Sequence, residues 1–374
     1  MSMTAHSQRG VALLTILLLV VSITVVAGSM LASQKIAIRR SGLVFDQNQL
    51  LQDINAGQQL AITMIRADNK LNDTDSEQDI WAQPIPPYAL GAHSISIELR
   101  DEAARFNINN LYQNGVVDTA ALALFQRLLT QLNLEPDIAI AVLDYQDTDS
   151  DVYLDGGDEK AVYNQQSSTA VNKTLPNQPF VSINQLQEVR GVTAEVLTTL
   201  RPYVTAAPYS VPINVNTASP VLLAALMDGG TREQMQQLVD MRSKRALESV
   251  DDVWQLPILS GLDTKQRAEL TPLLAVDSQA FMALITVTDN SNVGQARQRF
   301  ATVLISKTAT DASGIANSGD SNSTVPNNPN PSPNSENANT GNNNANSTNN
   351  TDDSNKAKNI KVVTQRLWAF RPSF

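Results

Sequence analysis

The sequence predicts an α+β fold, in which one long N-terminal helix and a small antiparallel sheet are interrupted by a large all-helical insertion. An unbroken apolar run begins at Val11 and passes into amphipathic helical spacing that continues to about residue 67. Strand-like segments occur near residues 94–100, 281–287, 299–305 and 360–370. Between the first two of these segments the patterns are helical, so the sheet is split in the sequence by an inserted helical block.

Composition excludes several classes of function. The chain has 374 residues, which is more than one ordinary domain, so we expect at least two cores. Its formal net charge of −10 opposes general nucleic-acid binding, which needs a basic surface. It has no cysteine, and its only histidines are His6 and an isolated His93. A disulfide framework, a histidine-based zinc site and a histidine-dependent catalytic triad are therefore not expected, and we predict no enzyme activity.

Residues 11–32 are predicted to span a membrane. About 20 apolar residues, at about 1.5 Å each, cross a bilayer core of about 30 Å as a helix. A cleaved secretory signal and a plain signal anchor both share the basic head and apolar run. The pair Arg9-Gly10 directly before the run resembles instead the leader of type IV prepilins. That resemblance implies that residues 1–10 are a leader peptide cut between Gly10 and Val11 by the prepilin peptidase, that Val11 is then N-methylated, and that the helix stays on the mature protein.

Thr15 refines this resemblance. Ordinary pilins carry a glutamate at the fifth mature position, which pairs with the amino terminus of a neighbouring subunit. Here that position is Thr15, counted from Val11, and it has no charge to offset a buried amine. A missing glutamate is a trait of minor pseudopilin K of type II secretion systems.

The helix is expected to continue through the soluble part as a spine. Apolar residues recur with helical spacing at Leu43, Leu50, Ile54, Ala61 and Ile65. Residues 33–105 are thus predicted to form the spine and the first part of a pilin-like domain. Its first strand, residues 94–100, alternates apolar and polar side chains.

Residues 106–277 are predicted to form the inserted α-domain. The stretch from Asp101 to Leu111 is similar to the "D-E-x-G-R-x-N-L-N-x-L" stretch of the K pseudopilins, with Ala104 where glycine is usual. We expect Asn107 and Asn109 to be structural, since asparagine caps backbone groups at turns. Two helices follow between Asp118 and Asp144.

An acidic passage after the second of these helices resembles a calcium loop. Calcium binds several oxygen ligands at 2.3–2.6 Å, and acidic side chains crowd this turn-rich segment. The passage is not an EF-hand, because Val152 stands where that loop has glycine. A solvated acidic loop is the alternative. The K pseudopilins bind calcium at a similar Asp-aromatic-x-Asp-x-Asp passage, and the resemblance implies a structural calcium site here. The predicted ligands are Asp144, Asp147, Asp149, Asp151, Asp155, Asp158 and Glu159.

Two segments, near 182–204 and 249–275, look like duplicated helix-hairpin-helix units. Such units often bind DNA, and the passage Ile213–Ser219 resembles the opening of competence DNA receptors. A membrane-anchored DNA-binding protein of a DNA-uptake pilus is therefore the alternative function. The hairpins at Gly191 and Gly261 lack a Gly-x-Gly pair, and the surrounding charge is acidic. We expect packing modules or a protein-docking surface, and no nucleic acid.

The chain is predicted to return to the sheet at its end. Residues 278–310 contain two strands, and residues 311–359 are rich in Asn, Ser and Pro and are expected to be disordered. Residues 360–374 contain a last strand. Because loop closure becomes costlier only slowly with length, this strand can still pair with the sheet.

Over nearly the whole chain the sequence resembles the K minor pseudopilins. The resemblance implies a non-enzymatic subunit at the pseudopilus tip, which starts or caps the filament for export of folded proteins across the outer membrane. It implies a single-pass protein of the bacterial inner membrane with its soluble part in the periplasm. The implied partners are minor pseudopilins I and J, the major pseudopilin filament, and the secretin or the exported substrate.

Overall fold

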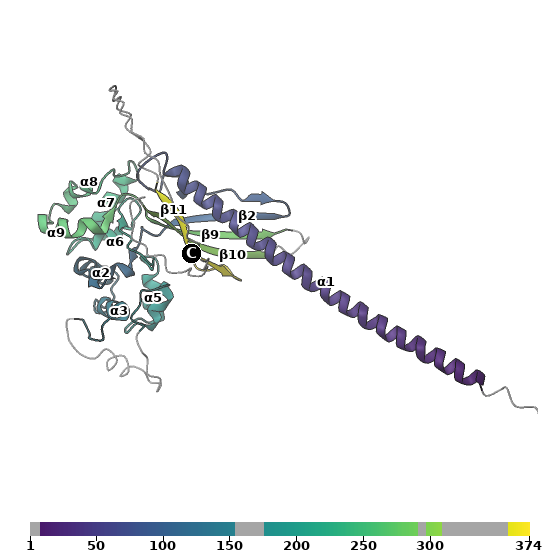
Figure 1. Cartoon of the computed structure of the whole chain (residues 1–374). Coiled ribbons are helices and arrows are strands. Elements are labelled where there is room, and N and C mark those ends of the chain that lie inside the picture. Colours follow the sequence, from purple (N-terminus) through teal and green to yellow (C-terminus); the bar gives the residue numbers. More distant parts are fainter. Residues whose placement is uncertain (1–7, 154–175, 291–296, 309–357) are drawn as a thin grey trace, which may run out of the picture.

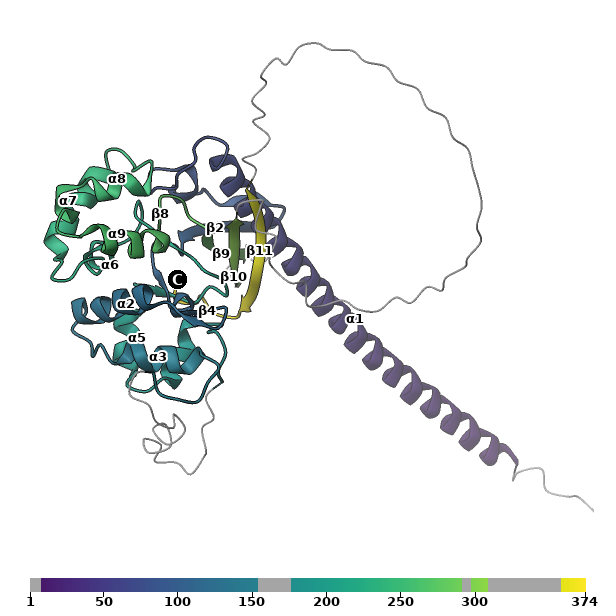
Figure 2. The ribbon, with the colours of Figure 1, turned by 60° about the vertical axis from the view of Figure 1, so that its left-hand side comes forward.

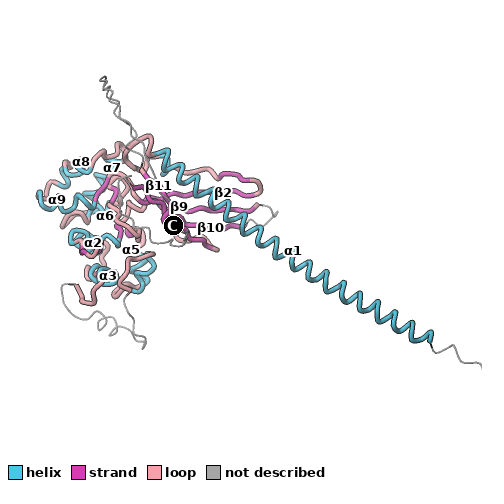
Figure 3. Tube along the Cα trace, in the orientation of Figure 1, coloured by secondary structure: helices cyan, strands magenta, loops and turns pink. Residues whose placement is uncertain are grey.

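The computed structural model describes residues 8–153, 176–290, 297–308 and 358–374. A long helix, α1 (Gln8–Asp68), lies with its rear part on a five-stranded sheet, while its front part extends away from all other elements (Figure 1). A block of short helices lies at the other end of the sheet from the free part of α1 (Figures 1 and 2). The colouring by secondary structure in Figure 3 separates this helical block from the strands.

The sheet is antiparallel throughout, in the order β1-β2-β9-β10-β11. Its strands are β1 (Tyr88–Leu90), β2 (His93–Asp101), β9 (Ala280–Asp289), β10 (Arg297–Thr308) and β11 (Asn359–Trp368). The neighbours β2 and β9 are paired so that Asp101 lies opposite Phe281, and the whole helical block leaves and re-enters the sheet at this end. The predicted mixed fold with a small antiparallel sheet is confirmed, and the last strand does pair with β10. Most of the predicted Asn-rich tract, 311–359, lies outside the described residues.

The rear part of α1 packs on the sheet through one face. Ile54, Ala61 and Ile65 are buried together with side chains of β2 and β9. At Gly57 the helix approaches the sheet so closely that an added Cβ would lie 2.7 Å from Cγ2 of Ile285. Leu43, which shares the helical spacing, is exposed, so the packed face begins only near Leu50.

The helical block is built from short elements around a second, larger core. After η1 (Ile80–Ala82) and β2, its elements in chain order are β3 (Phe106–Asn107), η2 (Ile108–Leu111), β4 (Tyr112–Gln113), β5 (Val116–Val117), α2 (Thr119–Gln131), α3 (Ile138–Gln146), η3 (Ile183–Glu188), α5 (Ala194–Leu200), β6 (Val204–Thr205), β7 (Ile213–Asn214), α6 (Pro220–Ala224), α7 (Arg232–Arg242), α8 (Val250–Trp254), η4 (Pro257–Leu259), α9 (Thr264–Leu270), η5 (Thr271–Leu273) and β8 (Leu274–Ala275). The two helices predicted between residues 118 and 144 are α2 and α3.

The helical block contains two copies of one arrangement. In the first repeat, residues 106–205, the opening strand β3 pairs in parallel with the closing strand β6. In the second repeat, residues 213–275, β7 pairs in parallel with β8 in the same way. In Figure 2 the helices of the first repeat (α2, α3, α5) lie below those of the second (α6 to α9). Each repeat therefore closes on itself through a pair of two-residue strands.

The end of each repeat is a short hairpin around a glycine. Thr193 and Asp263 occupy equivalent N-cap positions, and each accepts a hydrogen bond from a backbone N–H of its helix. Apolar side chains buried at matching positions are Leu186 and Leu256, Val189 and Leu259, Val192 and Leu262, and Leu200 and Leu270. The hairpins also differ, since Gly191 has φ +82° whereas Gly261 lies outside the left-handed region.

Candidate functional site

The front part of α1 carries the residues predicted to be processed. Gly10 and Val11 both lie within the helix, and Val11 is exposed. From Val11 onward an 18-residue window reaches a mean hydropathy of 2.8, and none of it is buried. Among the described residues α1 is the one helix long and apolar enough to cross a membrane. This makes the front part of α1 a candidate membrane anchor.

Thr15 satisfies its own hydroxyl within the helix. Its Oγ1 donates a hydrogen bond to the backbone oxygen of Ala12 at 2.9 Å. A threonine inside a helix can bond a carbonyl of the preceding turn in this way. The side chain therefore neither brings a charge nor requires a polar partner.

The predicted calcium loop begins at the end of α3. Asp144 lies in the helix and Asp147 is the residue that ends it, and both side chains are buried. Asp149 and Asp151 lie on the exposed turn that follows. The other predicted ligands, Asp155, Asp158 and Glu159, lie outside the described residues. In the part of the loop that the structure describes, no three of the carboxylates have oxygens within 4.8 Å of one another.

Asp147 provides the observation that fits a cation. Its Oδ1 has no hydrogen-bond partner among the described residues, although the atom is buried. Burial, followed by the negative charges of Asp149 and Asp144, raises the pKa of Asp147 to about 7. One oxygen of Asp144 is held by the backbone N–H of Tyr153 at 3.1 Å. A buried carboxylate with an unsatisfied oxygen and acidic neighbours is a donor set suited to a hard cation such as calcium.

Asn107 and Asn109 are structural, as predicted. Nδ2 of Asn109 donates to the backbone oxygens of Phe180 and Ala207, at 2.9 and 2.8 Å, and its Oδ1 accepts from the N–H of Phe180 at 2.9 Å. Asn107 likewise bonds both backbone groups of Ala207. These side chains close the first repeat and are not available to a ligand.

The sequence did not reveal two polar contacts of α1. His93, which the sequence presents as isolated, places Nδ1 2.5 Å from Oδ2 of the buried Asp53 and so joins α1 to β2. Asp68, at the end of α1, lies beside Asp75 and Asp79. Both contacts depend on the packing of α1 on the sheet, and the only local signal was an aspartate inside an otherwise apolar helical face.

Comparisons with known proteins identify the family. Two family models, both described as "Type II secretion system (T2SS), protein K", match residues 104–209 and 213–277. A relative from Klebsiella pneumoniae, "Type II secretion system protein K", is 31% identical over 75% of this chain and 89% of the relative. The chain belongs to the type II secretion system protein K family. A protein of the same name from Pseudomonas aeruginosa is 30% identical over 66% of this chain and 76% of its own length.

The solved structures agree with this assignment to the protein K family. The chain resembles one in the crystal structure of the "GspK-GspI-GspJ complex from enterotoxigenic Escherichia coli Type 2 Secretion System". The TM-score is 0.59 at 26% identity, over 70% of this chain and 92% of that one. The DNA-uptake alternative is not supported. The two matched regions of the protein K family also divide the helical block where the structure divides it, between β6 and β7.

Proposed function

We propose that this protein is the minor pseudopilin at the tip of a type II secretion pseudopilus, where it starts or caps the filament together with minor pseudopilins I and J. The observation that carries the proposal is the likeness to the chain in the GspK-GspI-GspJ complex, which extends over 92% of that chain. A long helix with a free apolar front and a head on its rear supplies the shape that such a filament subunit needs.

The chemistry of Thr15 supports the proposed position at the tip. A subunit inside the filament would have to neutralise the terminal amine of its neighbour in lipid, where an unpaired charge is costly. Thr15 offers no carboxylate, and its hydroxyl is already bonded to Ala12. At the tip no neighbour requires that carboxylate. The apolar surface of the front of α1 then packs laterally against adjacent spines.

We further propose that the leader is removed between Gly10 and Val11, that Val11 is N-methylated, and that α1 anchors the protein in the inner membrane with its head in the periplasm. The exposed apolar surface from Val11 onward supports this anchoring. In cells, Gly10→Ala should leave the full-length precursor uncut on an immunoblot. Gly28→Ala, inside the same apolar helix, is the matched control and should be processed. Equal processing of both variants would remove the leader assignment.

We also propose a structural calcium ion at the acidic loop, held by Asp144 and Asp147 with further carboxylates of residues 149–159. The unsatisfied Oδ1 of Asp147 supports this proposal. The hairpins around Gly191 and Gly261 are proposed to act as packing modules of helix-hairpin-helix type. Their apolar residues are directed into the block core, which supports packing rather than DNA binding.

Co-purification tests the proposed assembly. The full chain, extracted in detergent after co-expression with minor pseudopilins I and J of the same bacterium, should elute with both as one complex. The control fuses residues 1–45 to an unrelated soluble head, and it should not retain I and J. Elution of the full chain alone, or retention of I and J by the control, would contradict a tip complex formed through the head.

A further inference from the structure

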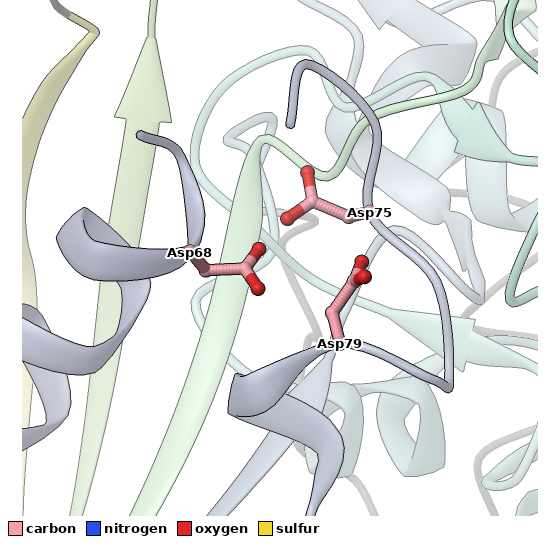
Figure 4. Close-up of side chains that lie close together, drawn as sticks. All are labelled: Asp68, Asp75 and Asp79. Carbon is pink, nitrogen blue, oxygen red and sulfur yellow. The ribbon is translucent and has the colours of Figure 1, made fainter. Parts of the chain in front are cut away.

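A second acidic group, away from the calcium loop, lies where α1 ends. Asp68 is the last residue of α1, Asp75 lies in the following loop, and Asp79 directly precedes η1. One carboxylate oxygen of each lies within 4.8 Å of the other two. Figure 4 shows the three carboxyl groups turned toward a common space. Asp68 and Asp75 are buried, at 2% and 0% exposure.

Two of these buried oxygens have no partner. Oδ2 of Asp68 and Oδ1 of Asp75 lack a hydrogen bond from any residue that the structure describes. Buried carboxylate oxygens are rarely left without a donor, because each loses its hydration on folding. The unsatisfied atoms belong to the carboxyl groups that face one another in Figure 4.

The protein holds the other oxygens of the same two groups in place. Oδ1 of Asp68 accepts from the N–H of Ile80 at 3.3 Å. Oδ2 of Asp75 accepts from the N–H of Ser278 at 2.7 Å and pairs with the buried ammonium of Lys307 on β10. The orientation of each carboxyl group is therefore fixed by one oxygen, while the second oxygen remains available to a ligand.

Asp79 is oriented by its own loop. Its Oδ2 accepts from the N–H of Ser76 at 2.6 Å, and its Oδ1 accepts from Nδ2 of Asn72 at 3.1 Å. A carboxylate oxygen has more than one lone pair, so these bonds leave capacity for a cation. The loop between α1 and η1 thus presents Asp79 toward Asp68 and Asp75.

The charges of the group do not balance. Three carboxylates face one another, and within the described part of the chain Lys307 forms an ion pair with one of them, Asp75. Lys358 lies near Asp75 but pairs with Asp277 at 2.8 Å. With all three carboxyl groups ionised, as they would be around a bound cation, two negative charges are left over, which is the charge that one divalent cation neutralises.

We propose that Asp68, Asp75 and Asp79 bind a calcium ion. Calcium takes carboxylate oxygens at 2.3–2.6 Å, so two oxygens on one ion lie at most about 5 Å apart, as these do. The ion fills the space left by the unsatisfied oxygens and balances the excess charge.

The position of the ion gives it a structural role. Asp75 donates its N–H to the oxygen of Val276 and accepts at its own backbone oxygen from Nδ2 of Asn214, which opens the second repeat. The ion therefore ties the end of α1 and β10 to the helical block. It lies at the end of α1, whereas α3, after which the acidic loop begins, lies at the far end of the helical block in both Figure 1 and Figure 2.

Terbium, a luminescent substitute for calcium, tests the site. Trp81, two residues after Asp79, is buried and is suited to sensitise a terbium ion held there. The full chain in detergent, carrying Asp147→Asn to weaken the acidic loop, should show tryptophan-sensitised terbium emission that calcium displaces. Trp81→Phe should remove the emission, yet leave calcium binding by equilibrium dialysis unchanged.

Matched carboxylate variants locate the ligands. In the same Asp147→Asn background, Asp79→Asn should weaken calcium binding by at least about tenfold, and Asp68→Asn should do the same. Glu77→Gln, at an exposed position of the same loop, should bind as the parent does. Asp79 is only half-buried, so this variant is expected to fold, which circular dichroism checks. Unchanged affinity in folded Asp79→Asn, or no calcium bound by the parent, would overturn the proposal, whatever the outcome at the acidic loop.

Discussion

The two repeats of the helical block share the same arrangement, in which an opening strand pairs in parallel with a closing strand. Equivalent residues of the two repeats nevertheless bond to different parts of the molecule. In the first repeat Asn110 bonds both backbone groups of Val211. In the second repeat Thr217 stands at the equivalent position and donates instead to the buried carboxylate of Asp101, at the end of β2. At this position the first repeat bonds the segment between the two repeats, whereas the second repeat bonds the end of the sheet. The first repeat reaches a charged group next to β2 through a different residue, since Thr205 donates to the buried carboxylate of Glu102.

The acidic loop distinguishes the first repeat. It occupies the connection between α3 and η3, whereas the equivalent connection in the second repeat, between α7 and α8, spans only residues 243–249. The second repeat forms its parallel strand pair β7–β8 with only this short connection. The loop is therefore not needed for closure, which favours a ligand-binding role for it.

The largest expected effect comes from the asparagines that close each repeat. Asn216 bonds both backbone groups of Leu247 and the oxygen of Val276, as Asn109 bonds Phe180 and Ala207. Each orphaned buried group costs roughly 1–3 kcal/mol. Asn109→Ala and Asn216→Ala should each lower the free energy of unfolding by about 3 kcal/mol or more.

Urea unfolding of the detergent-solubilised chain, followed by tryptophan fluorescence, measures these losses. Asn184→Ala is the control, since Asn184 is exposed and should change stability by less than about 0.5 kcal/mol. A large loss of unfolding free energy in only one of Asn109→Ala and Asn216→Ala would show that the two asparagines do not have equivalent roles.

Asp101 should make stability depend on pH. Burial raises its pKa to about 6, above the ordinary 3.8. The folded chain then holds this proton more tightly than the unfolded chain. The resulting contribution of Asp101 to the free energy of unfolding is complete below about pH 4, and it is lost as pH rises through about 6. At about 1.4 kcal/mol per pKa unit, about 3 kcal/mol is lost between pH 4 and 7.

The same unfolding measurement, made from pH 4 to 7, isolates this contribution. The stability of the wild type relative to Asp101→Asn should fall by about 3 kcal/mol over that range. Asp251→Asn, at an exposed position, should show no such trend relative to the wild type. A constant difference between the wild type and Asp101→Asn would show that the buried carboxylate does not titrate in this range.

Calcium should act on the first repeat. At a hundred times its dissociation constant, a bound ion stabilises by about 2.7 kcal/mol. A chelator should therefore speed amide exchange of α3 and residues 147–153 by up to about a hundredfold. In Asp147→Asn the response at α3 should be absent. An equal chelator response in wild type and variant would refute the loop site.

The smallest expected effect is a difference in stability between alanine variants at the two hairpin glycines, Gly191 and Gly261. An alanine at position 191 must adopt φ +82° and places its Cβ 3.3 Å from Cγ1 of Ile138. Gly261 has neither constraint, with no atom within 4 Å. Gly191→Ala should lower the free energy of unfolding by about 1–2 kcal/mol, because a residue with a Cβ is strained in the left-handed region. Gly261→Ala should lower it by less than about 0.5 kcal/mol. Equal losses would show that the hairpins are constrained alike.

Periodic elements could be predicted from the sequence, and contacts between distant segments could not. The spine, α2 and the four longer strands each carry an apolar pattern, and α3 begins two residues after Pro136, a residue typical of a first helical turn. The strand pairs β3–β6 and β7–β8 are two residues long, too short for any period to show. The group of Asp68, Asp75 and Asp79 depends on Lys307 and Ser278 from the far end of the chain, which no local pattern indicates.

The candidate sites divide in the same way. The leader and the acidic loop are local sequence patterns, so their residues could be named in advance. The pairing of His93 with Asp53 requires α1 to lie on β2, and so it became visible only in the structure.

The central claim is that a trimmed but retained apolar helix carries the folded head. Intact-mass measurement of the protein extracted from the inner membrane tests it most directly. We predict a single species that begins at Val11, with one added methyl group on its amine. A species that begins after residue 32 and is recovered free in the periplasm would contradict the claim.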